Sequence, residues 1–135
     1  MKKIVVEKIK KHLIGEGWVI EKIKKLDFWA FHADAPAFCV VQAGACLIFF
    51  CDMPLNASWE KRRSHFFELL NSINNSFSHG VRVIKLNDEH VDMLHASAVW
   101  HNYYNEKEFG QFFDQFVSSV VDLYHNDDII SNLKV

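Results

Sequence analysis

The chain has 135 residues, of which half are apolar and 14% are aromatic, so it can fill one core and is not expected to be intrinsically disordered. Its formal net charge is −2, but residues 1–25 hold eight Lys against three Glu, so the start is basic and the remainder acidic. Because no aromatic-interleaved basic motif accompanies the lysines, we favour a solvated helix face over a nucleic-acid surface.

The cysteines and the N-terminus point to a protein of the cytoplasm. Cys39, Cys46 and Cys51 are odd in number, lie in apolar runs and lack a CxxC spacing, so neither a disulfide framework nor a zinc ribbon is expected. The N-terminus alternates basic and apolar residues and contains no continuous apolar segment typical of a signal peptide or membrane span. We predict one unexported α+β domain over residues 1–135.

The first elements in chain order are a helix and a group of strands. Residues 3–14 place Val5 or Val6, Ile9 and Leu13 on one side of a helix, with Gly15 as its stop. Residues 17–52 form short runs rich in Val, Ile, Phe and Trp, separated by short turns. Connections this short cannot hold parallel crossovers, so we predict an antiparallel meander of three or four strands.

A central helix is predicted over residues 58–77, SWEKRRSHFFELLNSINNSF. Its N-cap would be Ser58, and Gly80 would supply a left-handed stop. Before it, residues 53–57 should leave the sheet, because Pro54 cannot donate to a strand ladder. The apolar stripe of this helix follows the helical period and consists of Trp59, Phe66, Leu70, Ile73 and Phe77.

The last third of the chain predicts a β-hairpin followed by a C-terminal helix. The hairpin would turn at Asp88 and Glu89, and Asn105 would cap the helix in a capping-box arrangement with Glu108. Residues 126–135 are expected to be a loose tail. The apolar stripe of the helix consists of Phe109, Phe112, Phe113, Phe116, Val120, Leu123 and Tyr124.

The predicted fold is therefore α+β, with helices packed on one sheet face and the other face solvated or covered by a partner. The order of elements and the run LLNSINNSF, residues 69–77, resemble the YbjN-like family of small bacterial proteins. Four residues match that family's motif at the end of the central helix: Leu70, Asn71, Asn74 and Phe77. The resemblance implies the fold of type III secretion chaperones, no enzymatic activity, and a chaperone-like or regulatory role. Chaperones that share this fold are acidic homodimers, whereas this chain begins with lysines.

The asparagines of the motif and the histidines are the candidate ligand-binding residues. Asn71 and Asn74 favour a structural role on neighbouring backbone, with ligand binding as the alternative. His90, His95 and His101 lie near acidic residues, but no HxH or HxxxH spacing is present, so neither a metal nor a cofactor is predicted.

The cysteines are predicted to be buried small hydrophobes. A two-residue turn at Ala43 and Gly44 would pair Cys39 with Ile48 and leave Cys39 and Cys46 as a diagonal pair. Diagonal neighbours lie about 7 to 8 Å apart, beyond comfortable disulfide reach.

The predicted function is a bacterial protein-binding module that acts as a homodimer through an open sheet face. Catalytic motifs with recognised spacing are absent from the sequence, so a small enzyme is disfavoured. The candidate partner surface consists of large apolar strand residues: Trp18, Trp29, Phe31 and Phe49. The alternative is binding to nucleic acid or an anionic surface through Lys3, Lys8, Lys10, Lys11, Lys22, Lys24 and Lys25.

Overall fold

The computed structural model describes residues 3–76, 81–87, 92–101 and 103–132. Within these residues, six strands form one antiparallel sheet in the order β1-β2-β3-β4-β6-β5. The strands are β1 Val19–Lys24, β2 Asp27–His32, β3 Ala35–Ala43, β4 Cys46–Pro54, β5 Arg82–Asn87 and β6 Asp92–Trp100. The helices are α1 Lys3–Gly15, α2 Ser58–Lys61, α3 Arg63–Ser76, α4 Glu106–Tyr124 and α5 Asp127–Ile130.

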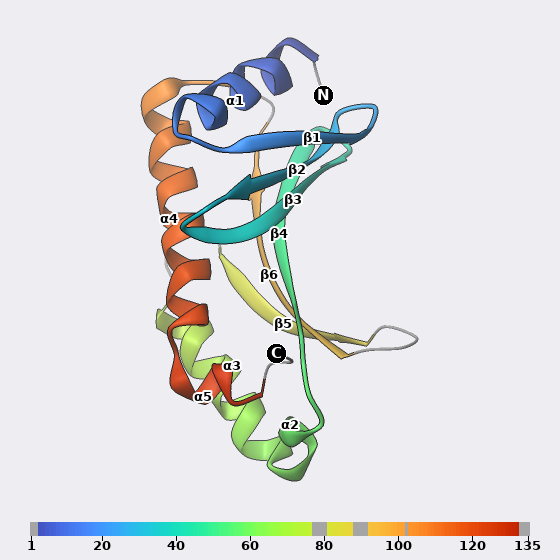
Figure 1. Cartoon of the computed structure of the whole chain (residues 1–135), viewed down its shortest axis with the longest axis vertical. Helices are drawn as coiled ribbons and strands as arrows, with labels where there is room; N and C mark the ends of the chain where they lie inside the picture. The colour runs from blue at the N-terminus through green and yellow to red at the C-terminus, as the bar shows by residue number, and fades with distance from the viewer. Residues whose placement is uncertain (1–2, 77–80, 88–91, 102, 133–135) are drawn as a thin grey trace.

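The helices pack against one face of the sheet, which confirms the predicted α+β architecture. In Figure 1, α4 runs along the sheet, with α1 near the β1 end and α2, α3 and α5 towards the opposite end. The core lies between these helices and the sheet. Its centre is a set of interlocking rings contributed by β3, β4 and α4: Phe38, Phe49, Phe109, Phe113 and Phe116.

The first helix follows the predicted stripe, because Val5, Val6, Ile9 and Leu13 are all buried. Its stop differs from the prediction. The left-handed residue is Gly17, with φ at +93°, rather than Gly15. The amides of Trp18 and Gly17 donate to the carbonyls of Leu13 and Ile14, both at 3.0 Å, which is the Schellman pattern of helix termination.

The predicted central helix is divided in two at Arg62, which has φ −131° and ψ 48°. Ala57 rather than Ser58 is the N-cap of α2, and the Asn56 side chain accepts the Ser58 amide proton at 2.8 Å. The apolar spacing could not reveal this break, since Trp59 and Phe66 are both buried on either side of it, with ring centroids 5.6 Å apart. Phe77 and Gly80 lie outside the described residues.

Two further expectations about the strands and the tail are corrected. Strand β4 does not end before Pro54 but includes it as its last residue, in register with Met93 on β6. The tail is not loose over residues 126–132. There, Asn126 caps α5 by accepting from the amides of Asp128 and Ile129, and Ile129 is fully buried. The backbone N–H of Asn56 also donates to the backbone carbonyl of Asn132 at 2.8 Å, which connects this segment to the end of β4.

The β-hairpin and the C-terminal helix agree with the sequence prediction. Strands β5 and β6 pair antiparallel, while the predicted turn at Asp88 and Glu89 lies outside the described residues. The Asn105 side chain accepts the Glu108 amide proton at 3.0 Å, which confirms Asn105 as the N-cap, while the Glu108 carboxylate accepts from the Tyr103 hydroxyl at 2.6 Å. In the stripe of α4, Phe112 is half-buried and Tyr124 is 38% exposed, while the other predicted members are buried.

Candidate functional site

The face of the sheet that points away from the helices carries many large apolar side chains. Side chains alternate along each strand, so the residues that flank the buried core positions belong to this second face. We call it the open face. Its exposed large apolar residues come from the two edge strands and from β2 and β6: Val19, Trp29, Phe31, Ile84, Leu86 and Val99. Half-buried Val41, Ile48 and Phe50 connect them across the middle of the sheet.

Six residues of the open face lie in one row that crosses the whole sheet. Each pair of neighbours in the row is in register on adjacent strands. We call this the central row, and from the β1 edge to the β5 edge it contains Glu21, Trp29, Cys39, Phe50, Ser97 and Arg82. It begins with a carboxylate and ends with a guanidinium, while its interior is apolar or small.

A polar side-chain contact lies next to the central row. His95 on β6 and Asp52 on β4 are in register, and Nδ1 of His95 is 2.5 Å from Oδ1 of Asp52. The ring of Phe50 lies 5.2 Å from the His95 imidazole, centroid to centroid. The His95 and Asp52 side chains are 16% and 30% exposed. The open face therefore combines apolar area with one fixed polar pair, a combination typical of binding surfaces.

The four predicted surface residues divide between the two faces. Trp29 and Phe31 lie on the open face, each 39% exposed, with their rings stacked at 6.4 Å. Trp18 and Phe49 are core residues, 6% and 0% exposed, because Trp18 packs on Phe38 and Phe113 and Phe49 points towards α4. The prediction that these two form a partner surface is wrong, since the sequence alone does not settle on which side of the sheet each side chain lies.

The three cysteines are unpaired. Cys39 is in register with Phe50 rather than Ile48, and Cys46 with Ala43, because the β3–β4 turn is formed by Gly44 and Ala45. The predicted diagonal pair is therefore wrong. Burial is the main cause that raises the pKa of the Cys39 thiol to about 11 and that of the Cys51 thiol to about 12. Both thiols stay protonated at neutral pH and are poor nucleophiles.

The histidines do not gather into a metal site in the part of the chain that the structure describes. No group of three or more His, Cys, Asp or Glu lies close enough there to hold a metal ion. His90 is outside the described residues. His101 stacks on Tyr103 with ring centroids 6.3 Å apart, and His95 is held by Asp52.

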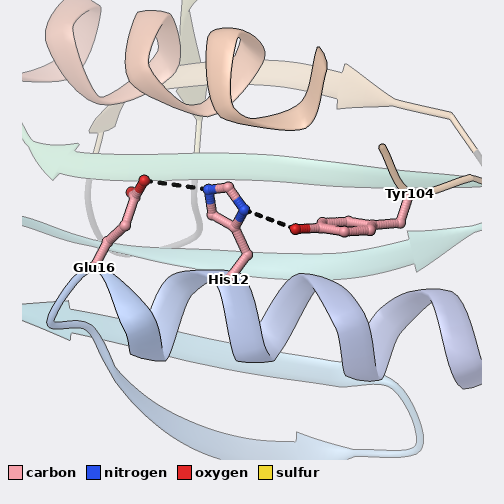
Figure 2. A network of polar contacts seen from close by, with 3 residues as sticks. All are labelled: His12, Glu16 and Tyr104. Carbon is pink, nitrogen blue, oxygen red and sulfur yellow. Dashed lines mark hydrogen bonds and ion pairs between the residues drawn. The ribbon is translucent and has the colours of Figure 1, made fainter. Parts of the chain in front are cut away.

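A second polar cluster lies in a cleft of about 600 Å³ beside α1. His12 bridges two groups: its Nδ1 lies 2.9 Å from the Tyr104 hydroxyl and its Nε2 lies 3.2 Å from Oε1 of Glu16 (Figure 2). The imidazole also packs against the Phe109 ring in a T-shaped arrangement, with the ring centroids 5.0 Å apart. If Nε2 carries the proton that Glu16 accepts, Nδ1 accepts from the Tyr104 hydroxyl. The cluster thus fastens α1 to the segment that leads into α4.

The predicted lysine surface is only partly free. Lys10 has a side chain that is 15% exposed, with its ammonium 3.7 Å from Oε1 of Glu7 and 5.4 Å from the centre of the Phe28 ring. The other described lysines of the set are exposed, on α1 and around the β1–β2 turn. In the described helices, none is long and apolar enough to cross a membrane.

Comparison with known proteins identifies the fold of this chain. No protein-family profile matches the chain, and no curated protein matches it by sequence. YbjN from E. coli, described as a candidate transcription regulator, superposes with a TM-score of 0.69 over 96% of this chain and 94% of its own, at 12% identity. The chain has the YbjN fold. An uncharacterized protein from Methanothermobacter thermautotrophicus matches with a TM-score of 0.64 over 86% of this chain and 91% of its own, also at 12% identity.

The YbjN fold confirms the resemblance that the sequence indicated, and the structure locates the residues of its motif. Leu70 is buried in the core, whereas Asn71 is exposed. The Asn74 amide lies against strand β5: its Nδ2 donates to the Val83 carbonyl at 2.8 Å, and its Oδ1 accepts the Val83 amide proton at 2.7 Å. Through these two bonds, a helix side chain occupies backbone N–H and C=O groups of an edge strand that point away from the sheet. A neighbouring strand would bind the same groups.

Sequence reasoning missed several residues of the open face on this YbjN-fold sheet. Four exposed apolar residues are absent from the surface that the sequence predicted: Ile84, Leu86, Val99 and Val19. The signal was present, because residues 82–86 and 93–100 carry apolar side chains at both alternating positions, which indicates strands with two apolar faces. The His12 cluster carried a weaker signal, since only the His12–Glu16 spacing of one helical turn is visible in the sequence.

Proposed function

We propose that this protein is a non-catalytic bacterial binding module that holds a protein partner on the open face of its sheet, in a chaperone-like or regulatory role. The observation that carries the proposal is the apolar open face itself. All the described helices lie against the other face, so side chains such as Trp29, Phe31 and Ile84 remain between 39% and 47% exposed. Monomeric soluble proteins rarely expose apolar area of this extent unless it binds something.

Two further observations support the proposal. YbjN, which shares the fold, is named as a candidate transcription regulator rather than as an enzyme. The unpaired cysteines suit a reducing compartment such as the cytoplasm, where we place the protein.

Site-directed photocrosslinking tests the proposal. A photoreactive phenylalanine analogue replaces Phe31 on the open face, and in a matched protein it replaces Tyr124 on α4. The two positions are 39% and 38% exposed, so they differ in face but not in accessibility. After irradiation of cells that produce each protein, we expect protein adducts from position 31 and none from position 124. Equal yields from the two positions, or none from either, would contradict a binding role of the open face.

Binding to nucleic acid is the second candidate. The observation that favours it is the set of exposed lysines, Lys3, Lys8 and Lys11 on α1 with Lys22, Lys24 and Lys25 at the β1–β2 hairpin. Phosphate contacts release counterions, so such binding would weaken steeply with salt. Fluorescence anisotropy of a labelled oligonucleotide at low ionic strength tests this candidate, and no anisotropy change would remove it.

A further inference from the structure

We infer that the partner seated on the open face is a second copy of this chain, related by a two-fold axis that runs along the strands between β3 and β4. This inference rests on the proposed function and names its occupant. Because this axis reverses the strand order, the second copy presents its strands across the interface in the opposite order. Strand β1 therefore faces β5 of the second copy, β2 faces β6, and β3 faces β4.

Charge complementarity in the central row is the first argument. The two-fold axis places Glu21, at the β1 edge, opposite Arg82 at the β5 edge of the second copy, and symmetry forms the pair twice. Among the described residues, neither side chain has an ion-pair partner, and the Arg82 side chain uses one guanidinium nitrogen on the Val81 carbonyl at 2.8 Å. A guanidinium has five N–H donors, so others remain for a carboxylate.

Complementarity of size is the second argument. Along the central row, the same axis places Trp29 opposite Ser97 and Phe50 opposite Cys39, so that each large ring meets a small side chain. In the adjacent row, Val19 in register with Phe31 occupies one end and Ile84 in register with His95 the other. Val19 would then cover Ile84, which removes from water two apolar side chains that are 66% and 47% exposed.

Dimensions are the third argument. Six strands about 4.8 Å apart span about 24 Å, and strands of this length run about 20 to 30 Å, so the open face has a footprint of about 500 to 700 Å². A stable interface buries about 800 Å² of accessible surface per partner, which a corrugated footprint of that size supplies. Two packed sheets cross at about 30°. This angle displaces the end of one central row from the facing end of the other by about 6 Å, a distance that Glu and Arg side chains can span.

A charge-reversal series tests the inference by light scattering of the full chain during size-exclusion chromatography. We expect twice the chain mass for the wild type over a dilution series. Glu21→Lys and Arg82→Glu should each raise the dissociation constant at least tenfold, because each reverses two symmetric pairs. The double variant should recover most of the loss. Glu68→Lys, an exposed reversal on α3, is the matched control and should leave the mass unchanged. Circular dichroism of each variant checks folding.

Other outcomes separate the inference from the proposed function. A dimer that ignores the Glu21 and Arg82 reversals but dissociates on Ile84→Asp would overturn the two-fold pairing and leave the open face as the binding surface. A monomer at every concentration, together with photocrosslinks from position 31 to other proteins, would also overturn the second copy as occupant. A dimer unaffected by both the reversals and Ile84→Asp would contradict the inference, since its interface would lie elsewhere.

Discussion

The pairing of Asn74 with Val83 predicts a large loss of stability from a small change. Replacing Asn74 with Ala removes an acceptor 2.7 Å from the Val83 amide and a donor 2.8 Å from its carbonyl. Val83 is 1% exposed, so both groups lose their partner in a largely dry position. A buried group left without a hydrogen bond costs about 1 to 3 kcal/mol, and water from the strand edge recovers part of it, so we expect about 2 to 3 kcal/mol for the pair.

The neighbouring Asn75 supplies the matched control. It is exposed in the same helix, so Asn75→Ala brings the same gain in helix propensity without breaking these bonds. We expect Asn75→Ala to stay within about 0.5 kcal/mol of the wild type. Asn74→Asp should resemble Asn74→Ala, because a carboxylate accepts the Val83 amide proton but repels the Val83 carbonyl.

The assay is urea unfolding followed by tryptophan fluorescence, at one fixed protein concentration, because the proposed dimer would add to the apparent stability. The difference between Asn74→Ala and Asn75→Ala isolates the contribution of the Asn74 amide. If the two variants unfold at the same urea concentration, the bonds to Val83 contribute nothing and the reasoning is refuted.

Three further outcomes are expected. Phe38→Ala should lower the free energy of unfolding in urea by about 3 to 5 kcal/mol, since Phe38 is 1% exposed and packs among Trp18, Phe49, Phe113 and Phe116. Phe31→Ala on the open face should cost under about 1 kcal/mol in the monomer, and equal losses from the two variants would contradict the assignment of Phe38 to the core. With a colorimetric thiol reagent at pH 8, half-exposed Cys46 should react first, and Cys39 and Cys51 only after unfolding. The free energy of unfolding should fall as pH rises from about 9 towards 12, because unfolded thiols ionise near 9 while the pKa of Cys51 is raised to about 12 in the fold, and a constant free energy over this range would contradict the burial of Cys51. Tyr104→Phe should cost about 0.5 to 1.5 kcal/mol by removing the hydroxyl bound to His12, and a double-mutant cycle with His12→Ala should show coupling; additive losses would mean that the bond contributes nothing.

The sequence predicted the order of elements well because the apolar period of each segment is strong. Val5, Val6, Ile9 and Leu13 define α1 at the helical period, and the capping side chain of Asn105 marks the start of α4. The strands of the meander followed from runs of Val, Ile, Phe and Trp, and their antiparallel order from the short turns. These signals are local, so a single sequence is enough to read them.

What could not be predicted depends on contacts between distant segments. The side of the sheet on which Trp18 and Phe49 lie is settled by where α4 packs, and the register at Cys39 by a turn displaced by one residue. The break at Arg62 conserves the apolar stripe and so leaves no trace in the periodicity. Tyr104 meets His12 across 92 positions of sequence, a contact that only the fold creates.

The Asn74 side-chain amide, which occupies the backbone N–H and C=O of Val83, also blocks part of the β5 edge against pairing with another molecule. The free backbone groups of an edge strand can pair with an edge strand of another molecule, and this pairing can repeat from molecule to molecule and form fibres. At β5 the Asn74 side chain fills part of that ladder, and at β1 the exposed Lys22 and Lys24 disfavour close approach by another strand. A sheet face, in contrast, offers no further binding area once it is covered. The fold therefore disfavours open-ended polymerisation through its strand edges.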